Sequence, residues 1–191
     1  MRSARASAPP EASTTDVGAI TLLLGGARSG KSALAVELGR RHPGAVTFLA
    51  TCPPLDGELG ARITRHRAER PDWPTIEEPC DLAGALRSTG DDLVLVDCLT
   101  LWVNNLIHRG DTDDAVEVVA AEAAEVGAAR PGPTVVISNE VGMGVHPETQ
   151  LGRRYRDLLG RVNQIWASRA DTTLLLVAGR AVRLEDPWKV L

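Results

Sequence analysis

The chain has 191 residues, of which 43% are hydrophobic and only 3% aromatic, enough for one domain with a sizeable, mostly aliphatic core. Its net charge of -4 argues against a nucleic-acid-binding surface that covers the whole protein, and no stretch approaches the roughly 18 apolar residues of a membrane span. Cys52, Cys80 and Cys98 share no Cys-x-x-Cys spacing, which favours the reduced thiols of a cytoplasmic protein over a disulfide framework or a zinc site.

The N-terminal segment, residues 1–17, is rich in Ala, Ser, Pro and Thr and lacks the apolar core of a signal peptide. Its composition predicts a disordered tail. We therefore expect a single domain over residues 18–191, beginning with an apolar run at 19–24 that reads as a buried strand.

The motif Gly-Gly-Ala-Arg-Ser-Gly-Lys-Ser at residues 25–32 follows this strand and precedes a predicted helix that ends near Arg41. It fits the phosphate-binding loop (P-loop) pattern G-x-x-x-x-G-K-[ST] in the context that pattern requires. Glycines let backbone N–H groups turn towards phosphate oxygens, and the helix N-terminus adds partial positive charge. Lys31 would reach the β- and γ-phosphates and the Ser32 hydroxyl would ligate Mg²⁺, so the sequence predicts a nucleoside triphosphate site.

The rest of the chain alternates between apolar runs and helical patterns. Strands are predicted at 45–50, 75–78, 93–97, 134–138 and 172–178, and helices at about 57–70, 82–87, 99–107, 116–126 and from about 147. This order predicts an α/β, P-loop NTPase-like three-layer fold with a mostly parallel central sheet. Ligands should gather at the carboxyl ends of the strands.

Two acidic residues fall at these strand ends. Asp97 ends the third clear strand, where an acidic residue commonly holds the Mg²⁺ shell of a P-loop; the alternative is an N-cap of the helix after it. Glu140 follows the fourth clear strand in the sequence Asn-Glu-Val-Gly-Met-Gly. It could act as a base or metal ligand, or equally cap the next segment.

A basic cluster surrounds His66. On a helix, Arg62, His66 and Arg70 share one face, and several arginines together suit several phosphates. A neutral imidazole among them could attack phosphorus as a covalent nucleophile. A solvated basic helix face with an incidental histidine explains the spacing equally well.

Taken together, these motifs resemble the bifunctional adenosylcobinamide kinase / adenosylcobinamide-phosphate guanylyltransferase family of cobalamin biosynthesis. The matching pieces span about 25–180 and occur in the expected order. They are 25–32, 50–51, 62–71 around His66, 96–100, 138–144, 147–148 and 160–164.

The resemblance implies two reactions and a set of site residues. ATP or GTP phosphorylates adenosylcobinamide, and GMP then passes from GTP to adenosylcobinamide phosphate through a GMP–histidine on His66, with Lys31 also catalytic. It further implies a homotrimer with sites near the subunit interfaces. The implied nucleotide contacts are Gly25, Gly26, Ala27, Arg28, Ser29, Gly30, Lys31, Ser32, Ala50, Thr51, Cys52, Arg67, Ala68, Glu69, Arg70, Glu78 and Thr100, with Ser32 and Asp97 on Mg²⁺.

Two other functions fit part of the pattern. A monofunctional P-loop small-molecule kinase would leave His66 idle. A GTP-binding regulatory switch would hydrolyse GTP without modifying a corrinoid, and the sequence lacks the Asn-Lys-x-Asp motif that reads guanine in such proteins. The corrinoid contacts are not readable from the sequence, although Trp73 or Trp102 could supply them if they were exposed rather than part of the core.

Overall fold

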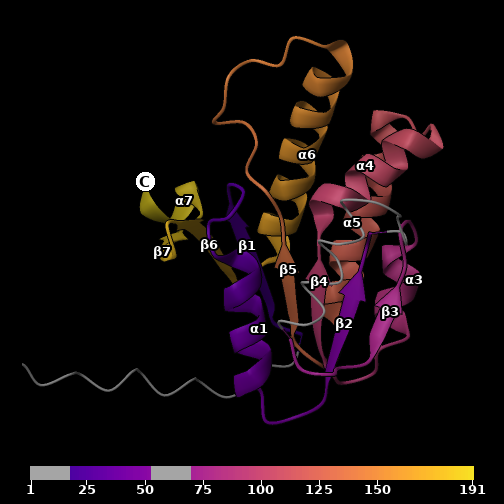
Figure 1. The fold of residues 1–191 in the computed structure, drawn as a ribbon, viewed down its shortest axis with the longest axis vertical. Helices are drawn as coiled ribbons and strands as arrows, with labels where there is room; N and C mark the ends of the chain where they lie inside the picture. The colour runs from indigo at the N-terminus through magenta and orange to yellow at the C-terminus, as the bar shows by residue number, and fades with distance from the viewer. Residues whose placement is uncertain (1–17, 53–69) are drawn as a thin grey trace, which may run out of the picture.

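The computed structural model describes residues 18–52 and 70–191, whose strands form one seven-stranded sheet with helices on both faces (Figure 1). The strands lie in the order β3-β2-β4-β5-β1-β6-β7. Their bounds are β1 Ile20–Gly25, β2 Val46–Ala50, β3 Thr75–Glu77, β4 Leu93–Asp97, β5 Thr134–Ile137, β6 Thr172–Val177 and β7 Arg180–Leu184. The helices are α1 Lys31–Arg41, α3 Leu82–Arg87, α4 Leu99–Arg109, α5 Asp113–Ala129, α6 Gln150–Arg169 and α7 Pro187–Val190.

Five of the six strand pairings are parallel, and only β7 runs antiparallel, against β6. The predicted mostly parallel sheet is therefore confirmed. Parallel pairing brings the carboxyl ends of β1, β2, β4 and β5 to one edge of the sheet. That edge, called the carboxyl edge here, carries the P-loop.

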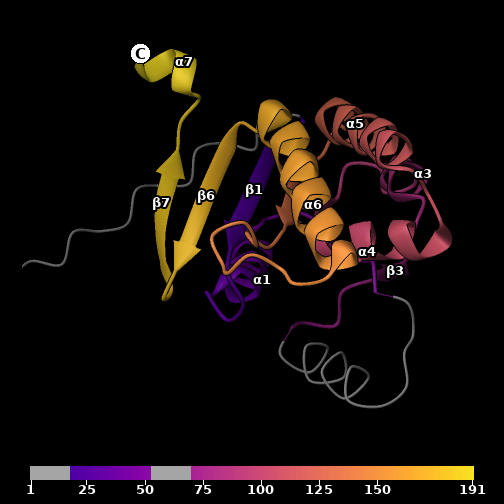
Figure 2. The same cartoon turned by 90° about the horizontal axis from the view of Figure 1, so that it is seen from above.

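Successive side chains of a strand point to opposite sides of the sheet. Both faces of the central strands are buried because helices cover both sides. Leu22 and Val96 pack into the larger cluster beneath α3, α4, α5 and α6. Leu23 and Leu95 pack into the smaller cluster beneath α1. Seen from above, α4, α5 and α6 gather on one side of the strands (Figure 2). Among the described residues, no helix is long and apolar enough to cross a membrane.

Most predicted elements are present within a few residues of their expected bounds. The Asp81 carboxylate caps α3 by accepting a hydrogen bond from the Gly84 N–H at 2.9 Å. The last predicted helix begins at Gln150 rather than near residue 147, because the Thr149 hydroxyl caps it through the Gly152 N–H. The tail over 1–17 and most of the helix expected over 57–70 lie outside the described residues.

Candidate functional site

The P-loop joins β1 to α1, as predicted. Gly25 and Gly30 have φ angles of 147° and 103°, which favour glycine, and a Cβ on Gly25 would lie 2.3 Å from the Leu176 carbonyl oxygen. Gly30 forms the N-cap of α1, and no side chain accepts a hydrogen bond there. The first N–H groups of α1 therefore have no capping side chain, an arrangement that leaves them for phosphate oxygens.

The P-loop lysine is buried beneath this loop, with only 6% of its surface exposed. The Lys31 ammonium donates hydrogen bonds to the carbonyl oxygens of Gly25 at 2.8 Å and Gly26 at 2.7 Å, and to the Ser29 hydroxyl at 3.3 Å. Burial lowers the Lys31 pKa, while the nearby Cys98 and Asp97 act in the opposite direction. The ammonium is thus held at the loop by acceptors that a phosphate oxygen could replace.

The ends of β2 and β4 meet beside this lysine. The Thr51 N–H donates to the Asp97 carbonyl oxygen at 3.1 Å. The Thr51 hydroxyl donates to the Cys98 carbonyl oxygen at 2.7 Å and accepts from the Cys98 N–H at 2.9 Å. Asp97 lies close enough to Lys31 to raise its pKa, so the predicted metal-binding carboxylate is near the P-loop.

The thiols at this edge are held in the neutral form. Burial and the nearby Asp97 raise the pKa of Cys98 to about 12. Burial, Asp97 and Glu77 also raise the pKa of Cys52, which follows Thr51 at the predicted nucleotide contact. Neither thiol is therefore activated as a nucleophile at neutral pH.

Two of the other predicted nucleotide contacts shape the protein backbone. Glu78 accepts hydrogen bonds from the N–H groups of Cys80 and Asp81, both at 2.8 Å, and its own N–H donates to the Ala50 carbonyl oxygen. The Thr100 hydroxyl accepts from the Asn139 N–H at 2.9 Å. Both residues flank the carboxyl edge, and their contact with a nucleotide stays a prediction.

A buried polar network behind the site was not predicted from the sequence. Asn163 on α6 is 6% exposed, accepts a hydrogen bond from the Ser138 hydroxyl at 2.6 Å and donates to the Asn139 carbonyl oxygen at 3.1 Å. Its helical spacing with the buried Leu159 and Trp166 places an amide on an apolar face, which is the signal that could have revealed it.

Glu140 forms a turn with its own neighbours. Its carboxylate accepts a hydrogen bond from the Gly142 N–H at 2.5 Å, and its N–H donates to the Gly25 carbonyl oxygen at 3.2 Å. The first of these hydrogen bonds braces the turn after β5, whereas the N-cap of the helix that follows is Thr149, and a role of Glu140 as base or metal ligand stays a prediction. The second contact ties the start of the β5–α6 connection to the P-loop.

The histidine-bearing segment lies mostly outside the described residues. His66, Arg67, Ala68 and Glu69 are not described, so neither the shared helix face nor the distance from His66 to the P-loop is tested. Arg70 is described: its guanidinium lies 3.7 Å from the centre of the Phe48 ring and donates to the Thr75 hydroxyl at 2.9 Å. These contacts fix the C-terminal end of that segment on β2 and β3.

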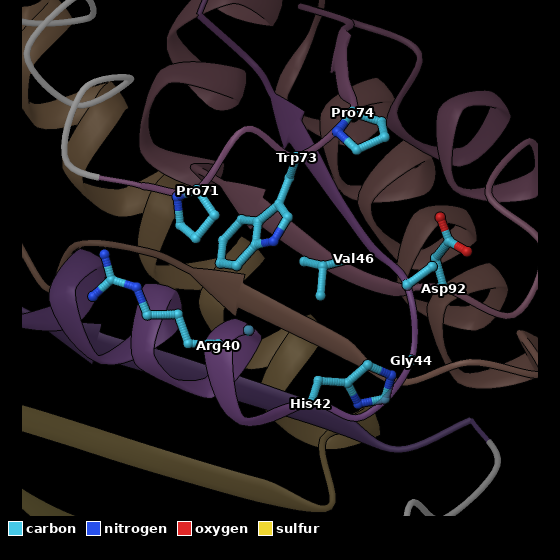
Figure 3. Close-up of a pocket in the computed structure, with 10 residues that line it drawn as sticks. Arg40, His42, Gly44, Val46, Pro71, Trp73, Pro74 and Asp92 are labelled. Atoms are coloured by element: carbon cyan, nitrogen blue, oxygen red, sulfur yellow. The ribbon is translucent and has the colours of Figure 1, made fainter.

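The two tryptophans considered for corrinoid binding differ in position. Trp102 is fully buried and donates to the Cys80 carbonyl oxygen at 2.8 Å, so it belongs to the core and cannot contact a substrate. Trp73 lines an open pocket of about 470 Å³ at the C-terminal end of α1, together with Arg40 and His42 (Figure 3). Because α1 spans eleven residues, roughly 16 Å, this pocket is well separated from the P-loop at the other end of that helix.

Metal binding at the carboxyl edge would depend on few protein ligands. Within 18–52 and 70–191, no three His, Cys, Asp or Glu side chains are grouped to hold an ion. Asp97 and the Ser32 hydroxyl nevertheless fit Mg²⁺, which commonly takes one or two protein oxygens and completes its shell with phosphates and water.

Comparisons with known proteins find sequence relatives that match most of this chain. A sequence profile described as cobinamide kinase / cobinamide phosphate guanyltransferase matches residues 21–184. The bifunctional adenosylcobalamin biosynthesis protein CobP of Pseudomonas aeruginosa is 44% identical over 170 residues, covering 86% of this chain and 96% of the relative. The corresponding CobU proteins of Escherichia coli and Salmonella typhimurium are 38% and 36% identical, each covering 86% of this chain and 98% of the relative.

Solved structures with low sequence identity share the fold. A type III secretion system ATPase is 15% identical with a TM-score of 0.51, covering 84% of this chain and 51% of that one. The flagellar accessory protein FlaH from Methanocaldococcus jannaschii is 14% identical with a TM-score of 0.51, covering 88% of this chain and 79% of that one.

The sequence relatives favour the two-activity prediction over a kinase with one activity and over a GTP switch. The P-loop with its buried lysine, the carboxylate at the end of β4 and the profile match over 21–184 all agree with this assignment. The chain belongs to the cobinamide kinase / cobinamide phosphate guanyltransferase family.

Proposed function

We propose that this enzyme catalyses two successive transfers on one corrinoid. ATP or GTP first phosphorylates the aminopropanol hydroxyl of adenosylcobinamide. GMP is then transferred from GTP to adenosylcobinamide phosphate, giving adenosylcobinamide-GDP and pyrophosphate. The observation that supports the proposal is the buried Lys31, whose ammonium donates hydrogen bonds to the carbonyl oxygens of Gly25 and Gly26 inside the P-loop.

In the kinase step, the substrate hydroxyl attacks the γ-phosphorus and the bond to the β-phosphate oxygen breaks. The ammonium of Lys31 and the N–H groups at the start of α1 would stabilise the charge on the leaving nucleoside diphosphate. Bound Mg²⁺, held by Ser32 and Asp97, would supply further neutralisation of phosphate charge.

In the guanylyl step, an imidazole nitrogen of His66 attacks the α-phosphorus of GTP and pyrophosphate leaves. A phosphate oxygen of adenosylcobinamide phosphate then attacks the same phosphorus, and the phosphorus–nitrogen bond breaks. The remaining implied contacts support the nucleotide: the P-loop, residues 50–52, residues 67–70, Glu78 and Thr100. Lys31 acts in both steps because each expels a phosphate group.

We further propose that the enzyme is a cytoplasmic homotrimer, and exposed apolar residues at the far edge of the sheet, formed by β6, β7 and α7, support the oligomer. Val177 and Val182 on β6 and β7 are 63% and 61% exposed, and Trp188 on α7 is 83% exposed. The Gly179 N–H in the turn between these strands donates to the Ser29 carbonyl oxygen at 2.9 Å. A subunit contact at this edge would therefore adjoin the P-loop.

Labelling with GTP that carries radioactive α-phosphate tests the guanylyl step. We expect wild-type protein to retain acid-labile, alkali-stable label, and His66→Ala to retain none while still phosphorylating adenosylcobinamide. Persistent label in His66→Ala would refute the histidine intermediate. If wild-type protein forms neither the phosphate nor the GDP product of adenosylcobinamide, the whole proposal fails.

A further inference from the structure

The connection between β5 and α6 starts beside the P-loop and exposes large apolar side chains. Met143 is 77% exposed and Val145 is 96% exposed, and these two residues are called the apolar tip here. The connection starts at Glu140, whose N–H donates to the Gly25 carbonyl oxygen. In both overall views the connection lies next to the P-loop at the start of α1 (Figures 1 and 2).

Hydrogen bonds brace the two ends of this connection, on either side of the apolar tip. Arg153 on α6 donates to the carbonyl oxygens of Pro147 at 3.0 Å and Glu148 at 2.7 Å. A nitrogen of Arg156 lies 2.9 Å from Nδ1 of His146. Val141 at the other end packs against the core. The apolar tip is thus presented to solvent by a supported backbone.

The position of the apolar tip matches what the acceptor substrate needs. A corrin ring has a rim of methyl groups and neutral amide side chains, and its reactive hydroxyl sits on a short aminopropanol arm. That arm must reach the P-loop, so the ring must lie against protein next to the carboxyl edge. An apolar surface there would remove methyl groups from water, a favourable transfer.

Other exposed apolar side chains of the described chain are less suited to this role. Val118 lies on α5, and Val182 and Trp188 belong to the far edge already proposed as a subunit contact. The Trp73 pocket lies at the opposite end of α1 from the P-loop.

We propose that Met143 and Val145 form part of the corrinoid-binding surface and contact the rim of the corrin ring. This inference rests on the proposed kinase activity. Gly144 between them is exposed, so an amide of the ligand can approach the backbone. The surface binds the acceptor in both transfers and takes no part in binding the nucleotide.

Kinetics of a double variant, Met143→Ser with Val145→Ser, test this assignment in the full-length protein. We expect the KM for adenosylcobinamide to rise about tenfold, because two apolar contacts are lost. The KM for the nucleotide, the kcat at saturating cobinamide and the GMP labelling without corrinoid should stay within twofold. The conservative pair Met143→Leu with Val145→Ile should restore the cobinamide KM.

Val118→Ser is the matched control, because it removes an apolar side chain that is 66% exposed on α5. It should leave every parameter unchanged. An unaltered cobinamide KM in the double variant would overturn the assignment, as would a raised KM accompanied by a smaller mass in sedimentation, which would show a subunit contact instead. Both results require an active wild-type enzyme, so they are distinguishable from failure of the proposed function.

Discussion

Two buried cations lie at opposite edges of the same sheet. Lys31 is 6% exposed at the carboxyl edge, and Arg130 is 4% exposed at the amino edge, where α5 leads into β5. Burial lowers the pKa of each, and a nearby carboxylate, Asp97 or Asp92 respectively, opposes that shift. By burial and electrostatics alone the two residues are alike.

Lys31 and Arg130 differ in the hydrogen-bond acceptors that they contact. Arg130 spreads its planar guanidinium over five oxygens of two segments, the turn before β4 and the start of β5, which it ties together. These are the carbonyl oxygens of Gly90, Asp92, Gly132 and Pro133 and the hydroxyl of Thr134, at 2.8 to 3.3 Å. Among the residues that the structure describes, Lys31 donates hydrogen bonds only to atoms of its own loop. A buried cation therefore marks a site when its acceptors are local and replaceable, and a structural joint when they connect distant segments.

Replacing the lysine should give the largest change in activity. In Lys31→Met we expect kcat/KM for both transfers to fall about 10²- to 10³-fold, because the cation that stabilises the leaving phosphates is lost. Folding should be retained, since a side chain of similar volume replaces a buried charge. Assays of each product together with urea unfolding check this. Unchanged activity would place Lys31 with Arg130 as a structural cation.

Replacing the arginine should do the reverse. In Arg130→Met we expect the free energy of unfolding to fall by about 3 kcal/mol, because buried carbonyl oxygens lose their donors. Activity per folded molecule should match wild type, since Arg130 lies at the edge remote from the P-loop. Urea unfolding and kinetics below the transition measure the two quantities. A loss of turnover at full folding would contradict the comparison.

The sequence predicted the lysine site because its determinants are local. Eight consecutive residues between a strand and a helix specify the P-loop, and the acceptors of Lys31 lie within six residues of it. The mostly parallel sheet needed no long-range knowledge either, because alternation of strands and helices favours parallel pairing, whereas the order of its strands was not predicted. Asp97 was proposed as a metal ligand because it ends an apolar run, and the structure places it at the end of β4.

What the sequence did not predict depends on contacts between distant segments. The five acceptors of Arg130 include Gly90, 40 residues away, and Asn163 bonds Ser138 from 25 residues away. β7 was missed because all five of its residues are exposed, so no burial pattern signals a strand that is held by backbone pairing with β6. Trp102 could be core or surface until its neighbours were known.

The pH dependence of stability at high pH distinguishes the two cations by a smaller effect, because only Lys31 can lose its proton in that range. The Lys31 pKa is lowered in the folded protein relative to 10.5. Between the lowered pKa and 10.5 the unfolded chain binds more protons at this position, so the Lys31 contribution to stability rises with pH. It levels off above 10.5 and is lost again as pH falls through the folded-state pKa.

Urea unfolding of wild type and Lys31→Met across this range, without nucleotide or Mg²⁺, measures the effect as a difference. Wild type should gain on the variant by at most about 1.4 kcal/mol for each pH unit between the two pKa values. Tyr155 and Cys98, whose pKa values burial raises to about 12, reduce stability at high pH in both proteins and largely cancel in the difference. Arg130→Met should show no such trend against wild type. A flat difference for Lys31→Met would mean that burial at the P-loop does not lower the lysine pKa, and the ammonium would then be as firmly charged as the guanidinium at the other edge.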